Sequence, residues 1–205
     1  MTESFVLYVD GFNLYHGLHQ KSGRADLWLD LVALARTLRP SSDLLRVRYF
    51  TAPVLGDPAA ASRQNEYLAA LNAHNGTMIE IVHGRHQRKA IRCHQCGHHR
   101  FSYEEKETDV NIAVSLVSDA ASGKVDAALL LSADSDLAPA VRSARQLNPA
   151  MFITAVFPPK RQSVELTKLM PKSMYLGINR IRAAQLPETV IGAAGKSWTR
   201  PAYWR

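Results

Sequence analysis

The sequence has only two cysteines, Cys93 and Cys96, among its 205 residues. Two cysteines this close together cannot join distant parts of a chain, which argues against a secreted fold held by disulfides. No apolar run approaches the roughly 20 residues that a membrane-spanning helix needs. The N-terminus also lacks the basic region and cleavage site of a signal peptide. We therefore expect a protein of the reducing cytoplasm that has no contact with membranes.

Internal repeats and low-complexity segments are absent as well, and a chain of this length with 46% hydrophobic residues is expected to form one main domain. Short apolar runs predict five strands, at residues 5–9, 45–50, 78–82, 127–131 and 152–157. Helical patterns lie between them, at residues 29–38, 58–73, 109–120 and 136–147. This alternation predicts an α/β fold in which helices cover both faces of a mostly parallel sheet of about five strands.

Two segments interrupt the alternation. Residues 83–103 are polar, basic and rich in histidine, and we interpret them as an insertion into a domain of residues 1–182. Residues 183–205 have the turn-forming composition of a C-terminal extension. The aromatic residues of this extension lie among basic ones, a combination that can stack nucleobases and bind phosphates. We favour the alternative that they pack back onto the domain.

The formal net charge is +7. Such a charge occurs in ordinary basic proteins, and it also suits a protein that binds a polyanion such as RNA or DNA. Acidic residues gathered at strand ends of a basic chain favour the second explanation, because the acids can hold a metal ion while surrounding bases hold phosphates.

Acidic residues directly follow the first and the fourth predicted strand. With their polar neighbours, they are Asp10, Asn13, Ser132, Asp134 and Asp136. Ligands bind at the carboxyl ends of strands in open α/β sheets, and neighbouring carboxylates repel each other unless a proton or a cation lies between them. We therefore expect one shared divalent-metal site, although each residue taken alone is also explained as a helix cap.

A further acidic segment, residues 104–109, leads into a predicted helix. The helix dipole favours acids at this end, but it does not explain Lys106 among them. Lys106 could neutralise carboxylates or contact a phosphate. Asp109 falls in the first helical turn, from which it could reach a metal ion between the strand ends.

Three segments resemble, in order and spacing, the motifs of the NYN domain family, a branch of the PIN-like nucleases. They are VDGFNL at residues 9–14, EKETDVN at 105–111 and LSADSD at 131–136. The resemblance covers roughly residues 5–180, and the end of the chain is also similar to that of some bacterial members. It implies a Rossmann-like three-layer α/β/α fold, a Mg²⁺ or Mn²⁺ site and cleavage of RNA.

The resemblance also implies roles for individual residues. Asp10, Asp109, Asp134 and Asp136 would be the catalytic, metal-binding acids. Asn13 would accompany Asp10, and Ser132 would orient the loop. Phosphodiester hydrolysis needs an activated water molecule and charge neutralisation, which divalent ions held by carboxylates supply, and hard oxygen ligands suit Mg²⁺ or Mn²⁺. His16 lies near this site, and we expect it to be a helix-surface or packing residue rather than a catalytic one.

The insertion has a chemistry of its own. Cys93 and Cys96 form a CxxC knuckle, which presents two thiolates to one zinc ion. Zinc needs four ligands, and the nearby candidates are His83, His86, His98 and His99. We expect two of them, with His98 and His83 named first, or the knuckle of a second chain in a homodimer, to complete the set. The alternative is a polar surface loop with free thiols. The basic residues that make this insertion the expected RNA-binding surface are Arg85, Arg88, Lys89, Arg92 and Arg100.

The sequence thus predicts a cytoplasmic, divalent-metal-dependent endoribonuclease with RNA as its partner and a structural zinc ion in the insertion. Two alternatives stay open. One is a non-catalytic module that binds RNA or a protein on the same fold. The other is an enzyme that acts on a nucleotide or another small molecule.

Overall fold

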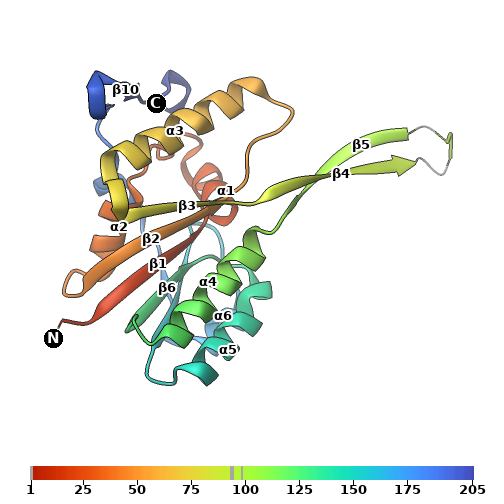
Figure 1. The fold of residues 1–205 in the computed structure, drawn as a ribbon. Helices are drawn as coiled ribbons and strands as arrows, with labels where there is room; N and C mark the ends of the chain where they lie inside the picture. Colours follow the sequence, from red (N-terminus) through yellow and green to blue (C-terminus); the bar gives the residue numbers. More distant parts are fainter. Residues whose placement is uncertain (1, 93–94, 98) are drawn as a thin grey trace.

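The computed structural model describes residues 2–92, 95–97 and 99–205, with the backbone alone at residues 100, 102, 104 and 194. A parallel six-stranded sheet lies at its centre, in the order β3-β2-β1-β6-β7-β8 (Figure 1). The strands are β1 (Ser4–Asp10), β2 (Asp43–Thr51), β3 (Ile79–His83), β6 (Ala127–Leu131), β7 (Phe152–Phe157) and β8 (Met174–Tyr175). Five of them agree with the predicted strands, and β8 is an additional edge strand.

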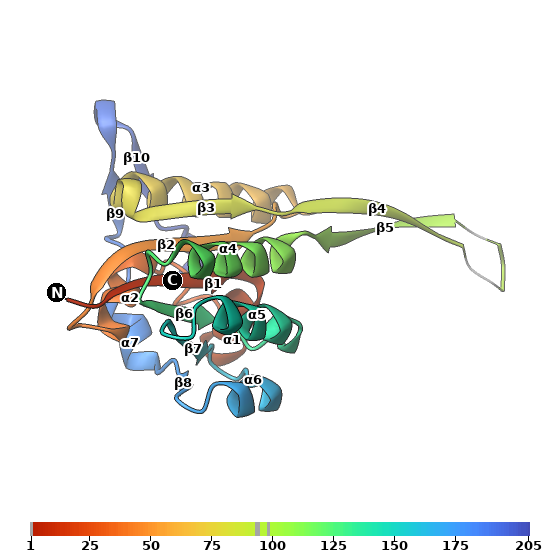
Figure 2. The same ribbon diagram turned by 60° about the horizontal axis from the view of Figure 1, so that its bottom comes forward.

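Helices cover both faces of the sheet (Figures 1 and 2). One layer contains α1 (Gly11–Ser22), α2 (Leu31–Leu38), α3 (Pro58–Asn75) and α7 (Ile178–Ala183). The other contains α4 (Thr108–Ser122), α5 (Ala138–Leu147) and α6 (Val164–Leu169). Short 3₁₀ helices occur at Gly76–Met78 (η1), Ser135–Leu137 (η2), Ala193–Gly195 (η3) and Ala202–Trp204 (η4).

Strand β1 shows why the sheet is covered on both sides. Successive side chains of a strand point to opposite faces. Phe5, Leu7 and Val9 pack in the core beneath α1, α2 and α3, whereas Val6 and Tyr8 pack in the core beneath α4 and α5. A continuous apolar run is therefore buried on both faces, as is typical of parallel sheets. The predicted three-layer α/β/α fold is confirmed.

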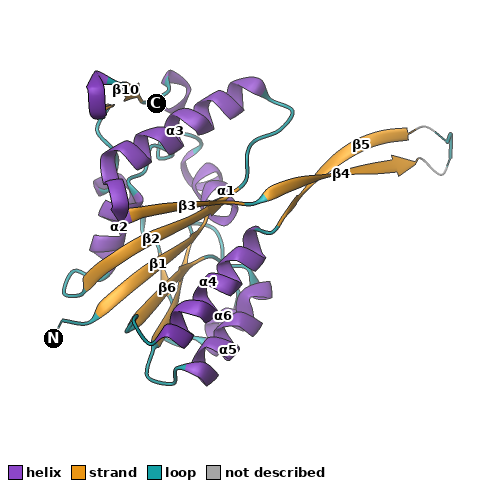
Figure 3. Cartoon of the chain, in the orientation of Figure 1, coloured by secondary structure: helices purple, strands orange, loops and turns teal. Residues whose placement is uncertain are grey.

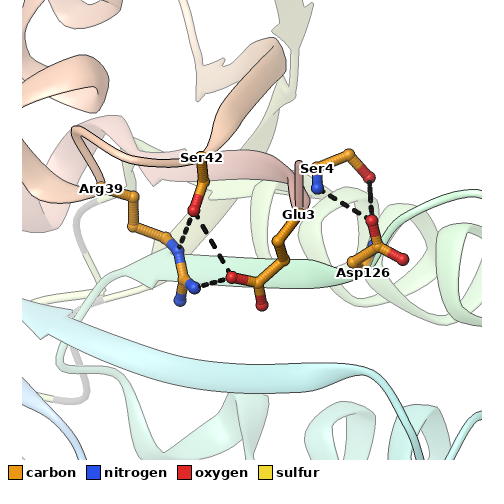
Figure 4. A network of polar contacts seen from close by, with 5 residues as sticks. All are labelled: Glu3, Ser4, Arg39, Ser42 and Asp126. Atoms are coloured by element: carbon orange, nitrogen blue, oxygen red, sulfur yellow. Dashed lines mark hydrogen bonds and ion pairs between the residues drawn. The ribbon is translucent and has the colours of Figure 1, made fainter. Parts of the chain in front are cut away.

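The amino end of β1 is fastened by a polar network (Figure 4). The backbone N–H and the hydroxyl of Ser4 donate to Asp126 Oδ2 at 2.8 and 2.7 Å, just before β6. Arg39, which follows α2, pairs with Glu3 and donates from Nε to Ser42 Oγ at 3.2 Å. These contacts close the edge of the sheet opposite the carboxyl ends of its strands.

The segment predicted as an insertion, residues 83–103, falls largely within an antiparallel hairpin of β4 (Arg85–Arg92) and β5 (His99–Lys106). The hairpin is paired from Arg85↔Lys106 to Arg92↔His99, and it therefore extends three residues beyond the predicted end. It projects away from the body of the molecule (Figures 1, 2 and 3), and we call it the arm. A hairpin of this kind satisfies its backbone hydrogen bonds without a core of its own. A polar sequence can therefore form it.

The C-terminal extension forms a second small hairpin, β9 (Thr189–Ile191) with β10 (Ser197–Thr199), which packs beside α3 (Figure 1). Trp204 is buried and Trp198 packs against the core, as we favoured, but the Tyr203 ring is 55% exposed. The boundary between residues 182 and 183 stays a prediction. Within the described ranges, no helix has the length and apolar character needed to cross a membrane.

Candidate functional site

Asp10 lies where β1 meets α1, and it is only 2% exposed. Its Oδ1 accepts a hydrogen bond from the backbone N–H of Asn13 at 3.0 Å and so caps α1. Its Oδ2 accepts from Asn13 Nδ2 at 2.7 Å and from Ser132 Oγ at 2.8 Å. The Asp10 carboxylate is therefore held in one orientation by Asn13, its expected companion, and by Ser132, which was expected only to orient the loop.

Gly11 allows α1 to begin directly against β2. A Cβ atom at Gly11 would lie 2.6 Å from the carbonyl oxygen of Phe50 and 3.0 Å from Cε2 of Tyr49. Real side chains do not fit at such distances. The glycine after Asp10 thus permits the sharp passage from strand to helix that leaves the carboxylate at the edge of the sheet.

The loop after β6 is fastened to Asp10 through Ser132, which is fully buried. The backbone N–H of Asp134 donates to Ser132 Oγ at 3.0 Å, and that of Ala133 lies 3.4 Å from Asn13 Oδ1. Asp134 Oδ1 in turn accepts from the N–H of Asp136 at 2.9 Å. Asp10 and Asp134 therefore cap the helices that follow them, and the same contacts hold both carboxylates side by side.

Asp109 reaches this edge from the first turn of α4. The carboxylate of Glu105 accepts hydrogen bonds from both the backbone N–H and the hydroxyl of Thr108, the first residue of the helix. This contact holds the end of β5 against the start of α4. The base of the arm and the position of Asp109 are thus set together.

Gly84, which links β3 to β4 at the base of the arm, packs against the same turn. A Cβ atom at Gly84 would lie 2.5 Å from Thr108 Oγ1 and 2.8 Å from the carbonyl oxygen of Lys106. Glu107 adopts a left-handed backbone conformation with a φ of 79° and forms an ion pair with Arg85. Arg85 is therefore engaged at the base of the arm.

Asp10, Asp109 and Asp134 form the acid cluster. Each offers one carboxylate oxygen, and these oxygens all lie within 4.8 Å of one another. An all-oxygen donor set of this kind fits a hard divalent cation. Asp136 is exposed and is outside this group, although its charge adds to the field at Asp109.

Burial and mutual repulsion perturb these acids. Burial raises the pKa of Asp10, against the lowering effect of its hydrogen bonds from Asn13 and Ser132. Burial, followed by the charges of Asp10 and Asp134, raises the pKa of Asp109 to about 6. A bound cation would relieve the mutual repulsion of these clustered carboxylates, which is one cause of their raised pKa values. The cluster is therefore able to bind a divalent metal ion.

His16 is outside the acid cluster. Burial, with the charges of Arg161 and His19, lowers its pKa. It is an exposed residue of α1 at the wall of a cavity, and its expected role at the helix surface or in packing stays a prediction.

The arm presents basic and aromatic side chains on a common face. Tyr103 lies opposite Arg88 in the hairpin register and Phe101 lies two residues along, so the three side chains point the same way. The Arg88 guanidinium lies 4.2 Å from the centre of the Phe101 ring. Phe101 is 58% exposed and Tyr103 is 54% exposed. Arg92 shares this face, and the Arg100 side chain lies outside what the structure describes.

The proposed zinc ligands are only partly visible. Cys93 and His98 lie outside the described residues. Cys96 is an exposed, free thiol in the turn between β4 and β5. The CxxC knuckle thus stays a prediction.

His83 must be removed from the predicted zinc site. It ends β3 at the base of the arm, whereas Cys96 lies beyond the far end of β4. An eight-residue strand that rises ~3.3 Å per residue separates the two by roughly 25 Å. One zinc ion cannot bind both in a single chain. The hairpin pairing, which the sequence did not reveal, makes the sequence neighbour a distant residue.

The sequence interpretation missed a cavity of about 360 Å³ between α1, α3 and the C-terminal residues. Gly11 and Phe12, which follow Asp10 directly, lie at its wall. The volume is within the usual range for small-molecule sites. Its lining comes from separate segments of the chain, which no local pattern connects.

Comparison with known proteins identifies the family of this chain. The profile of the NYN domain matches residues 4–175. The 6-hydroxy-3-succinoylpyridine 3-monooxygenase HspA of Pseudomonas putida is 26% identical over 236 aligned residues, which cover 97% of this chain and 74% of that protein. The crystal structure of a protein of unknown function from Vibrio parahaemolyticus matches with a TM-score of 0.58 and 18% identity, covering 86% of this chain and 94% of that one. The structural match concerns the fold alone, whereas the domain match spans most of the sequence. The chain therefore belongs to the NYN domain family.

Proposed function

We propose that this protein is a divalent-metal-dependent endoribonuclease. The observation that carries the proposal is the convergence of Asp10, Asp109 and Asp134 at the carboxyl edge of the sheet. The family supports the reaction class, because NYN domains are typically nucleases. RNA is the proposed substrate because the basic arm begins beside the same acids.

Mg²⁺ or Mn²⁺ would be held by these three carboxylates, with Asp136 at the exposed rim. An ion there supplies charge neutralisation at the scissile phosphate and lowers the pKa of a water molecule. Asn13 and Ser132 hold Asp10 still, so that little reorganisation is needed when the ion enters. The combined negative charge of the three carboxylates favours cations over anions at this site.

The arm would hold the RNA. Arg88 and Arg92 can contact phosphates, while the exposed rings of Phe101 and Tyr103 can stack nucleobases. The base of the arm is joined to the first turn of α4 through Glu105. A strand of RNA lying along the arm would therefore be led to the acid cluster.

Zinc at the tip of the arm is part of the proposal. A two-stranded hairpin is marginally stable by itself, and small segments without a core need a staple. Cys93 and Cys96 would supply two ligands. His98, with the tip residue His99 in place of His83, would complete the set, unless the knuckle of a second chain does so in a homodimer.

A gel assay with RNA and with DNA of the same sequence tests the proposal. Cleavage of the RNA in Mn²⁺ or Mg²⁺, and none in chelator, is the expected result. Asp109→Asn should remove it, whereas Asp43→Asn, at the opposite edge of the sheet, should not. Activity that survives chelation, or equal activity of Asp109→Asn, would exclude the proposed site.

A second candidate function is the conversion of a small aromatic molecule. The cavity beside α1 favours it, as does the similarity to a protein named for its action on 6-hydroxy-3-succinoylpyridine. Incubation with that compound, oxygen and a reduced nicotinamide tests it. Consumption of the compound with formation of a hydroxylated product would support this candidate, and an unchanged compound would remove it.

A further inference from the structure

The cavity beside α1 has walls of packed aromatic rings. Tyr49, Tyr67 and Trp204 are each less than a tenth exposed and meet edge to face. Ring centres are 6.4 Å apart between Tyr49 and Tyr67 and 5.7 Å apart between Tyr67 and Trp204. The three residues come from β2, α3 and the C-terminal 3₁₀ helix. A flat apolar ligand would find preformed surfaces here, because these rings are already held in place.

Two arginines lie at the same cavity. The guanidinium groups of Arg24 and Arg63 lie 4.3 and 4.6 Å from the centre of the Tyr203 ring, and all three residues line the cavity. Within the described part of the chain, neither arginine forms an ion pair with an acid. Two like charges on one ring repel each other, and an anion between them would be stabilised by both.

The other groups that face the cavity do not supply that anion. The lining carboxylate, Asp57, is exposed and caps α3 by accepting from the N–H of Ala60 at 2.9 Å. Gln64 is engaged by the loop that follows β2, because it accepts from the backbone N–H of Val54 and donates to the carbonyl oxygen of Ala52. Among the residues that line the cavity, Arg24 and Arg63 are thus the permanently cationic groups that can meet an anionic ligand.

The cavity begins next to Asp10 in the chain, although none of the three clustered acids lines it. Gly11 and Phe12 at its wall follow Asp10 directly in the chain, and His16 lies one turn further along α1.

We propose that this cavity binds a planar aromatic ring that carries an anionic group. The ring lies against Tyr49, Tyr67 and Trp204, and the anion meets Arg24 and Arg63. A nucleotide, free or within RNA, and a small aromatic carboxylate share this chemistry. The inference does not rest on RNA cleavage, because binding in the cavity requires no turnover and no metal.

Isothermal titration calorimetry in chelator tests the inference. One arm uses AMP and UMP, and the other uses nicotinate and 4-hydroxybenzoate, with inorganic phosphate and acetate as anions that lack a ring. We expect at least one arm to bind with a Kd of roughly 0.1–1 mM, as is usual for ligands of this size. The arm that binds identifies the source of the ring.

Matched variants locate the binding. Ala60→Phe fills the cavity from α3, whereas Ala59→Phe adds the same ring on the exposed side of that helix. Arg63→Gln removes one charge at the cavity, whereas Arg36→Gln removes one from the exposed face of α2. Ala60→Phe and Arg63→Gln should each weaken binding about tenfold or more, and their controls should not, with thermal unfolding confirming that all four fold.

Two results would overturn the inference. One is that no ring-bearing anion binds more tightly than phosphate or acetate. The other is that Ala60→Phe binds as the unmodified protein does. Either result leaves RNA cleavage in Mn²⁺ unaffected, so failure of this inference is distinguishable from failure of the proposed function.

Discussion

Asp10 has two tasks at once, since the same carboxylate caps α1 and faces the acid cluster. Replacing it would disturb the start of a helix as well as any bound ion. Asp134 shares the cluster but caps only the short η2 helix. Asp134 is therefore the position where metal binding can be changed with little effect on the fold.

We expect Asp134→Asn to remove most of the stabilisation by Mn²⁺ while preserving the fold. An ion at one hundred times its Kd stabilises a protein by about 2.7 kcal/mol, and loss of one of three carboxylates should abolish most of this gain. In chelator, the variant should melt at the same or a higher temperature, because one repelling charge is gone. Thermal unfolding with and without Mn²⁺ measures both effects, and Asp43→Asn serves as the control. An equal Mn²⁺ response in Asp134→Asn would show that Asp134 is not a ligand.

The pKa of Asp109, raised to about 6, predicts an unusual pH dependence. The unfolded value is about 3.9, so the folded, metal-free protein binds this proton more tightly than the unfolded chain does. Its contribution to stability is therefore present below about pH 4 and is lost as the pH rises through about 6. Mn²⁺ competes with the same proton, so its stabilising effect should instead fade below about pH 6.

Melting temperatures from pH 4.5 to 7.5, with chelator and with Mn²⁺, check these opposite trends. Asp109→Asn should flatten the difference between the two curves. A Mn²⁺ effect of constant size across this range would contradict the coupling of Asp109 to the ion.

The arm is the element that the sequence could describe only in part. Its basic composition was visible, but its pairing was not, because polar residues without alternation give no strand signal. The pairing has consequences for individual residues. It separates His83 from Cys96, and it brings Arg88 to the same face as Tyr103.

Shortening the arm should separate RNA binding from metal binding. Replacing residues 88–103 by Asn-Gly keeps the pair Gln87↔Glu104 and the contact of Glu105 with α4, and Asn-Gly is the preferred two-residue hairpin turn. RNA affinity should fall. The plot of log affinity against log salt concentration should become less steep by roughly 1–3 units of slope, as expected when a few phosphate contacts are lost. Stabilisation by Mn²⁺ should remain. Titrations at several salt concentrations measure the slope, and an unchanged slope would remove the arm from the RNA-binding surface.

Metal analysis of protein purified without chelator addresses the tip of the arm. About one zinc ion per chain is expected if His98 and His99 complete the site, and about half an ion per chain if two chains share it. Cys96→Ser should lower the zinc content in either case. Protein without zinc, with two thiols that react freely in the native state, would identify the tip as an ordinary polar turn.

At the scale of the whole molecule, the sequence was sufficient for the features with a strong local signal. The buried strands are continuous apolar runs in the sequence, so β6 and β7 match their predicted ranges. The convergence of the acids that follow β1 and β6 could be predicted because parallel strands end at the same edge of the sheet. The edge strand β8 has two residues, and α6 and α7 have six each, which is too short for a periodic pattern. The cavity could not be predicted, since Tyr49, Tyr67 and Trp204 meet only after folding.

The most direct test of the central claim is the cleavage of a covalently closed circular RNA by the purified protein in Mn²⁺. A circle has no ends, so only an endonuclease can open it. We predict that the circle is converted first to a linear product and then to fragments, that chelator stops the reaction, and that Asp134→Asn lowers the rate at least about a hundredfold, as expected for loss of a group that holds charge in the transition state. An intact circle in Mn²⁺ and in Mg²⁺, or an Asp134→Asn variant as fast as the unmodified protein, would contradict the account.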